Sequence, residues 1–137
     1  MRRFILTLGL IWAAAWAQAQ EVLAPNPAIE STIQSQFEAF LADDVATAWQ
    51  YASPNIQRLF QTPENFGRLV REGYPMVWRP GRIDYLDLQT LGGLVVQRVQ
   101  VTDRQGRVHV LGYQMIETEA GWQINGVQFL RAPEVGA

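Results

Sequence analysis

The sequence contains no cysteine and no lysine, and His109 is its only histidine. Without cysteine the chain cannot form a disulfide, a thiolate nucleophile, a zinc ribbon or an iron–sulfur site. Without lysine it has neither a Schiff-base amine nor a phosphate-binding loop of the Walker type. A single histidine excludes a two-histidine metal site within one chain. We therefore expect no metal, no cofactor and no hydrolytic activity.

The residues that are present indicate one globular domain behind an export signal. The chain has 137 residues, 48% of them hydrophobic, which is typical of a single folded domain. Arg2-Arg3 precedes an apolar run over 4–16, and Ala17-Gln18-Ala19 offers small residues for cleavage. That run is shorter than the roughly 20 residues that span a bilayer. We expect residues 1–19 to be a signal peptide, cleavage near Ala19, and a periplasmic or secreted protein without membrane association.

Helical spacing characterises the first half of the remaining chain. Apolar residues recur at three- and four-residue steps over 28–42, and shorter helices are predicted from about 45, 54 and 63 onward. Asp43 or Asp44 is expected to cap the second helix, and Tyr74-Pro75 to leave the fourth in an extended conformation. Within the mature chain we expect a leader over 20–27, one domain over 28–132 and a tail over 133–137.

The second half changes to strand-like periodicity. Four runs, separated by short turns rich in glycine, cover 82–90, 94–102, 107–116 and 122–130. Connections this short allow only antiparallel neighbours. Helices followed by strands predict an α+β fold, in which N-terminal helices pack on one face of a curved four-stranded antiparallel sheet. On the last strand, Trp122 and Ile124 are expected to face the first helix.

Three stretches of the chain resemble a known family. They are Phe40 to Asp44 with Ala48-Trp49 and Ala52-Ser53-Pro54, then Phe60 to Phe66 with Gly73-Tyr74-Pro75 and Arg79-Pro80, and finally Gly121 to Val127. Together they resemble the bacterial family called domain of unknown function 4864, within the nuclear transport factor two-like superfamily. The resemblance implies a cone-shaped, cystatin-like α+β fold. It supplies no catalytic residue, because the family has no assigned activity.

In the isomerase and dehydratase branches of that superfamily, a pocket between helices and sheet holds an acid or base. Tyr85 and Asp87 are expected on one face of the first long strand, and Asp84 on the other. The candidate ligand-binding residues are mostly aromatic, although simple core packing also explains them. They are Trp49, Tyr51, Phe66, Tyr74, Trp78, Tyr85, His109 and Tyr113.

Three functions remain open from the sequence. The first is a non-catalytic exported domain that binds a small apolar molecule or a protein partner. The second is a small pocket enzyme, a lyase or isomerase that transfers a proton, and it requires an ionisable group at the base of a cavity. The third is a structural module that self-associates, for instance as a homodimer through the sheet. A nucleic-acid partner is not expected, because the arginines form no basic cluster.

Overall fold

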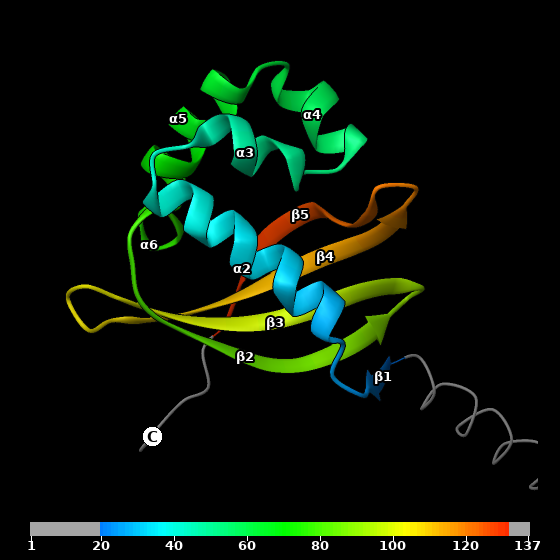
Figure 1. The fold of residues 1–137 in the computed structure, drawn as a ribbon. Helices are drawn as coiled ribbons and strands as arrows, with labels where there is room; N and C mark the ends of the chain where they lie inside the picture. The colour runs from blue at the N-terminus through cyan, green and yellow to red at the C-terminus, as the bar shows by residue number, and fades with distance from the viewer. Residues whose placement is uncertain (1–19, 132–137) are drawn as a thin grey trace, which may run out of the picture.

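The computed structural model describes residues 20–131, and the predicted signal peptide and tail lie outside these residues. Helices fill the first half of the described range and long strands the second (Figure 1). The elements are β1 (Gln20–Leu23), α2 (Pro27–Leu41), α3 (Val45–Gln50), α4 (Pro54–Phe60), α5 (Pro63–Gly73), α6 (Pro75–Trp78), β2 (Pro80–Leu91), β3 (Leu94–Asp103), β4 (Val108–Thr118) and β5 (Gly121–Leu130). Within residues 20–131, no helix is long and apolar enough to cross a membrane.

The sheet has five strands, so the prediction of four was wrong. It is antiparallel, and its strands follow the chain order β1-β2-β3-β4-β5. The four predicted runs correspond to β2, β3, β4 and β5. The additional strand, β1, lies in the segment predicted as a leader and pairs with β2 from Gln20↔Leu91 to Leu23↔Leu88. Its four residues are nearly all exposed, so they show no alternation by which a sequence pattern reveals a strand.

Helix α2 covers one face of the sheet and supplies much of the core (Figure 1). Ile29, Ile33, Phe37 and Phe40 recur along one side of the helix and are at most 1% exposed. Burial of side chains of this size contributes roughly 1.5–3 kcal/mol each. The prediction for β5 is confirmed, because Ile124 lies in the same core and Trp122 packs against it.

Polar side chains begin the first four helices. Each accepts a hydrogen bond from a backbone N–H in the first helical turn, which satisfies a donor that the helix leaves free. The caps are Asn26, Asp44, Ser53 and Thr62. Of the two alternatives for α3, Asp44 is therefore the cap, and Asp43 instead pairs with Arg79, with 2.5 Å between Oδ1 and Nη2.

The extended exit predicted at Tyr74-Pro75 was wrong, because a second helix follows after a single non-helical residue. Tyr74 has φ −134° and ψ 58°, so the residue before the proline leaves the helical region without reaching the extended one. Pro75 then occupies the first turn of the short helix α6, where its missing N–H costs no hydrogen bond. The chain therefore turns back over the sheet, where α6 buries Met76 and Val77.

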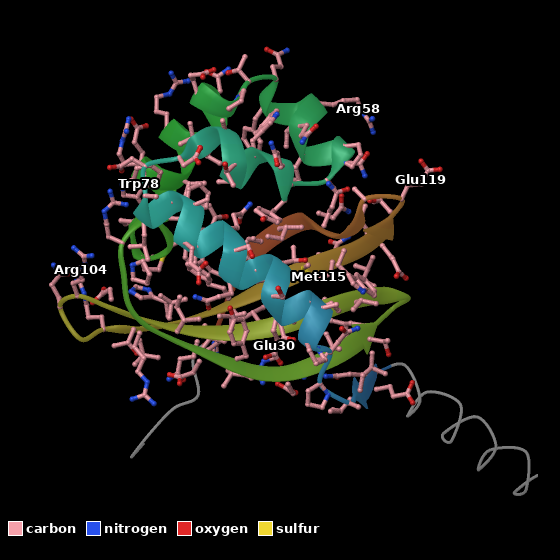
Figure 2. The ribbon with its side chains drawn as sticks, viewed as in Figure 1. Glu30, Arg58, Trp78, Arg104, Met115 and Glu119 are labelled. Atoms are coloured by element: carbon pink, nitrogen blue, oxygen red, sulfur yellow. The ribbon has the colours of Figure 1, made fainter. Side chains whose placement is uncertain are left out.

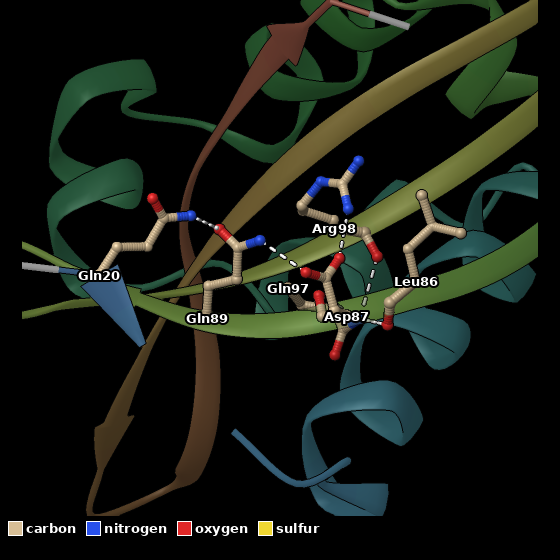
Figure 3. Close-up of polar contacts among 6 residues, drawn as sticks. All are labelled: Gln20, Leu86, Asp87, Gln89, Gln97 and Arg98. Carbon is tan, nitrogen blue, oxygen red and sulfur yellow. Dashed lines mark hydrogen bonds and ion pairs between the residues drawn. The ribbon is translucent and has the colours of Figure 1, made fainter. Parts of the chain in front are cut away.

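A β-bulge in β2 changes the face predicted for Asp87. Tyr85 pairs with Val99 and Leu88 with Gln97, so Leu86 and Asp87 together oppose the single residue Arg98. The extra residue puts Tyr85 and Leu88 on the helix-covered face, while Asp87 forms an ion pair with Arg98 on the outer face (Figure 3). The expectation that Tyr85 and Asp87 share a face was therefore wrong.

A second bulge ties α4 to the edge strand β5. Ile124 pairs with Met115 and Gly126 with Gln114, which leaves Asn125 unpaired in the ladder. The Asn125 side chain accepts a hydrogen bond from Ser53 Oγ at 2.6 Å, and the Ser53 N–H donates to Ile124 O at 2.8 Å. These bonds hold the start of α4 against β5, so that α4 is positioned at the edge of the sheet.

Candidate functional site

A cavity of about 230 Å³ lies between the helices and the sheet. Residues from α2, α4, α5, α6, β4 and β5 line it, and most of them are apolar. Phe40, Phe66, Val70 and Ile124 are examples of the buried wall residues. Figure 2 shows side chains filling much of the space between the two layers, and the cavity is the part of that interior which they leave open.

Two polar side chains form part of the inner wall. Gln36 on α2 is 5% exposed and Tyr113 on β4 is 1% exposed. The Gln36 amide donates to Ala48 O at 3.1 Å. Within residues 20–131, neither the Gln36 Oε1 atom nor the Tyr113 hydroxyl has a protein hydrogen-bond partner. In the same range, the one fully enclosed side-chain atom without a partner is Gln97 Oε1, so both Gln36 Oε1 and the Tyr113 hydroxyl must be reachable through open space.

The Tyr113 hydroxyl is neutral at physiological pH. Burial raises the pKa of Tyr113 above its usual value of 10.0, and the nearby Tyr85 and Tyr74 raise it further. A neutral phenol can donate one hydrogen bond and also accept. Tyr113 therefore offers a hydrogen-bonding group to the cavity, and it is a poor proton acceptor there.

The outer part of the cavity is apolar. Leu59 on α4 and Leu69 on α5 line it and are 68% and 39% exposed. Tyr74 also lines it, stacks on the exposed ring of Phe129 with centroids 4.9 Å apart, and donates its hydroxyl to Val127 O at 3.1 Å. Exposure thus increases from the polar inner wall to a mouth of leucine and aromatic side chains.

Three of the eight candidate residues line this cavity, namely Phe66, Tyr74 and Tyr113. Trp49 does not line it, although its ring packs on Phe66 with centroids 5.5 Å apart. Tyr51 lies just after α3, where its backbone carbonyl accepts the Ile124 N–H at 2.8 Å. These two residues support the wall and the edge strand from outside.

Trp78, labelled in Figure 2, lies at the end of α6 and does not itself line the cavity. Its ring packs on Phe40 with centroids 5.5 Å apart. The guanidinium groups of Arg79 and Arg71 lie 4.9 and 5.7 Å from the ring centroid, within the range of a cation–π interaction. Trp78 therefore joins the core to an arginine pair on the surface.

Tyr85 does not line the cavity either, and its hydroxyl makes a contact outside it. Its hydroxyl donates to Gln34 Oε1 on α2 at 2.9 Å. Burial raises the pKa of Tyr85, and the negative charges of Glu30 and Glu38 raise it further. This tyrosine thus links β2 to α2, and its hydroxyl already has a protein partner.

His109 and Tyr113 share the helix-covered face of β4, but they lie four residues apart. That separation corresponds to about 13 Å along a strand. His109 Nε2 lies 2.9 Å from the Oδ2 atom of Asp103, the last residue of β3, across the turn between β3 and β4. The hydrogen bond from His109 and the backbone N–H groups of Arg107 and Gln105 lower the pKa of Asp103 to about 2. This cluster holds the turn together and does not reach the cavity.

A further polar cluster lies at the bulge on β2 (Figure 3). Gln89 donates to Asp87 at 2.6 Å, and Gln20 donates to Gln89 at 3.1 Å. The hydrogen bond from Gln89 is the main cause of the lowered pKa of Asp87, and Arg98 lowers this pKa further. The buried Gln97 amide donates to Leu86 O at 2.9 Å, so it satisfies a carbonyl that the bulge displaces.

Sequence reasoning missed Gln36, the polar residue of the inner wall from α2. The signal that reveals it is its place beside the apolar stripe, three residues after Ile33 and four before Phe40. A polar residue on the buried side of an amphipathic helix marks a group that needs a partner. Ile56, Leu59 and Val127 were also missed, because a cavity wall and a filled core use the same residue types.

Within the described residues, no group of three or more acidic or histidine side chains is arranged to hold a metal ion. The family described as a domain of unknown function (DUF4864) matches residues 23–137 of the chain. No curated protein and no solved structure matches the chain.

Proposed function

The chain belongs to the DUF4864 family, and because this family is described only as a domain of unknown function, we propose a function from the cavity. The protein is an exported, non-catalytic domain that binds a small apolar molecule between its helices and its sheet. The observation that carries the proposal is an open, mostly apolar cavity in a region where a well-packed core would be filled.

The volume supports a small occupant. At about 230 Å³, the cavity exceeds the roughly 150 Å³ that is known to accommodate benzene in an apolar protein interior. It is smaller than the roughly 300–1,000 Å³ of sites for drug-sized ligands. In proportion to benzene, a molecule of about nine non-hydrogen atoms fits inside.

The lining favours binding over proton transfer. None of the described residues that line the cavity is a carboxylate, a histidine or an arginine. A general base must lie within hydrogen-bond reach of the proton it removes, and the raised pKa of Tyr113 keeps its hydroxyl protonated, so that it does not act as that base. The open interior also favours ligand binding over the self-associating module, for which a filled interior is expected.

The arrangement supports a placement in the nuclear transport factor two-like superfamily. Helices lie over one face of a curved antiparallel sheet (Figure 1), with the cavity between the two layers. We propose that the fold is the cone of that superfamily, with the cavity at its open end. The export signal predicted for residues 1–19 supports a location of this binding domain in the periplasm or outside the cell.

Toluene is a suitable first probe, because it is apolar and smaller than the cavity. We expect toluene to raise the melting temperature of the mature protein in a thermal-shift assay. A ligand at a hundred times its Kd adds about 2.7 kcal/mol to the free energy of unfolding. Val127→Phe should abolish the shift by filling the cavity, since Val127 lines it.

Val95→Phe is the matched control. Val95 and Val127 are both partly buried strand valines packed against the core, but Val95 does not line the cavity. The toluene shift should therefore persist in Val95→Phe. A wild-type protein without any shift, or an equal loss in both variants, would show that the cavity is not a binding site.

A further inference from the structure

The cavity has an unusual polarity, because among the described residues the lining side-chain groups left without a protein partner lie at its buried end, whereas the Tyr74 hydroxyl in the outer part already donates to Val127 O. The inner groups belong to Gln36 and Tyr113, which are 5% and 1% exposed. The outer wall residues Leu59 and Leu69 are 68% and 39% exposed. A ligand that hydrogen-bonds to Gln36 and Tyr113 therefore enters with its polar end first and keeps its apolar part toward the mouth.

The two inner groups differ in what they require. The Gln36 Oε1 atom can only accept a hydrogen bond, whereas the Tyr113 hydroxyl can donate one. A carbonyl or an ether on the ligand would serve the tyrosine but not the glutamine. A hydroxyl serves both, because it donates one hydrogen bond and accepts another.

The charge of the lining residues further restricts the chemical class of the ligand. The described lining contains neither an arginine nor an acidic side chain. An ionised group placed at the inner end would lose its hydration without gaining a partner of opposite charge, which is strongly unfavourable. The buried end therefore suits an uncharged group.

We propose that the cavity takes an uncharged, mostly apolar molecule with a hydroxyl at its buried end, hydrogen-bonded to the Tyr113 hydroxyl and the Gln36 amide oxygen. This inference rests on the proposed function, since it specifies the ligand class of the same cavity. An aromatic or aliphatic alcohol of about nine non-hydrogen atoms fits both the volume and the polarity. Longer alcohols extend their apolar part past Leu59 and Leu69.

The test compares p-cresol with p-xylene, which has the same shape with a methyl group in place of the hydroxyl. Their dissociation constants are measured by calorimetry on the mature protein and on Tyr113→Phe. Removing the Tyr113 hydroxyl should weaken p-cresol about two- to twelve-fold, the effect of one hydrogen bond. The affinity for p-xylene should stay the same or increase. Because this hydroxyl has no partner among the described residues, the variant should fold as wild type does.

Tyr85→Phe is the matched control, because its hydroxyl bonds Gln34 outside the cavity lining. It should lower the melting temperature and leave both affinities unchanged. Gln36→Met should weaken p-cresol relative to p-xylene, and retained p-xylene binding shows that this variant is folded. Benzoate, the charged probe, should not bind.

The outcomes separate the inference from the proposed function. If both probes bind but Tyr113→Phe changes their affinities equally or not at all, the hydroxyl assignment is overturned and the apolar cavity stands. Benzoate that binds as tightly as p-cresol would overturn the uncharged class. If neither p-cresol nor p-xylene binds the wild-type protein, the proposed function fails together with this inference.

Discussion

Gly67 offers a one-methyl test of the packing that supports the cavity wall. It is buried in α5, next to the wall residue Phe66. A Cβ at this position would lie 2.5 Å from Val45 Cγ1 and 3.2 Å from Val45 Cβ, well inside the optimal carbon separation of about 3.5–4.0 Å. The branched side chain of Val45 has few rotamers to move into. Gly67→Ala should therefore push α3 and α5 apart.

The expected magnitude is a balance of two opposing effects. Overpacking of one methyl group in a well-packed site costs about 1–3 kcal/mol. Replacing glycine by alanine in a helix stabilises the helix by up to about 1 kcal/mol. The free energy of unfolding of Gly67→Ala should thus fall by about 1 kcal/mol, measured by urea denaturation with tryptophan fluorescence.

Two comparisons make this prediction specific. Gly73→Ala, at the end of the same helix, adds a Cβ with no atom within 4 Å, so stability should be unchanged or slightly raised. In a Val45→Ala background the closest clash is absent, and Gly67→Ala should cost less there than in the wild type. If Gly67→Ala were as well tolerated as Gly73→Ala, the close approach of α3 and α5 would be refuted.

Two further predictions concern pH and export. The pKa of Asp103 is lowered from 3.8 to about 2 in the folded protein, so its stabilising effect is complete above about pH 4 and is lost as the pH falls toward 2. In urea denaturation, Asp103→Asn should lose less stability between pH 5 and 2 than the wild type does. Full-length protein made in a bacterial host should lose residues 1–19, as judged by intact mass, and recovery of an uncleaved membrane-bound chain would contradict export.

Local chemistry made most of the fold predictable from the sequence. Ser53 and Thr62, each followed by a proline, mark helix starts because a capping side chain and a proline act within one turn. The short turns between the strands permit only antiparallel neighbours, so β2 to β5 follow from chain order alone. β1 escaped prediction because its exposed residues are held by backbone pairing with β2, which leaves no hydrophobic pattern.

The faces of individual residues depended on contacts distant in sequence. The expected placement of Asp87 assumed strict alternation along β2, and the bulge opposite Arg98 broke that alternation. The displaced carbonyl of Leu86 is satisfied by Gln97 from the neighbouring strand. Such a bulge is a property of two paired strands, so one strand's sequence does not disclose it.

The sequence by itself determined α2 to α5 and β2 to β5, their order and the residue types available for chemistry, because each of these is a local or compositional property. The tertiary structure decided which of the candidate aromatics surround open space. Phe66, Tyr74 and Tyr113 line the cavity while Trp49 and Trp78 pack outside it, although all are large and aromatic. An aromatic residue has the same sequence pattern in a filled core and in a cavity wall. The two differ only in whether other side chains of the protein fill the space next to the ring, and the tertiary structure decides this.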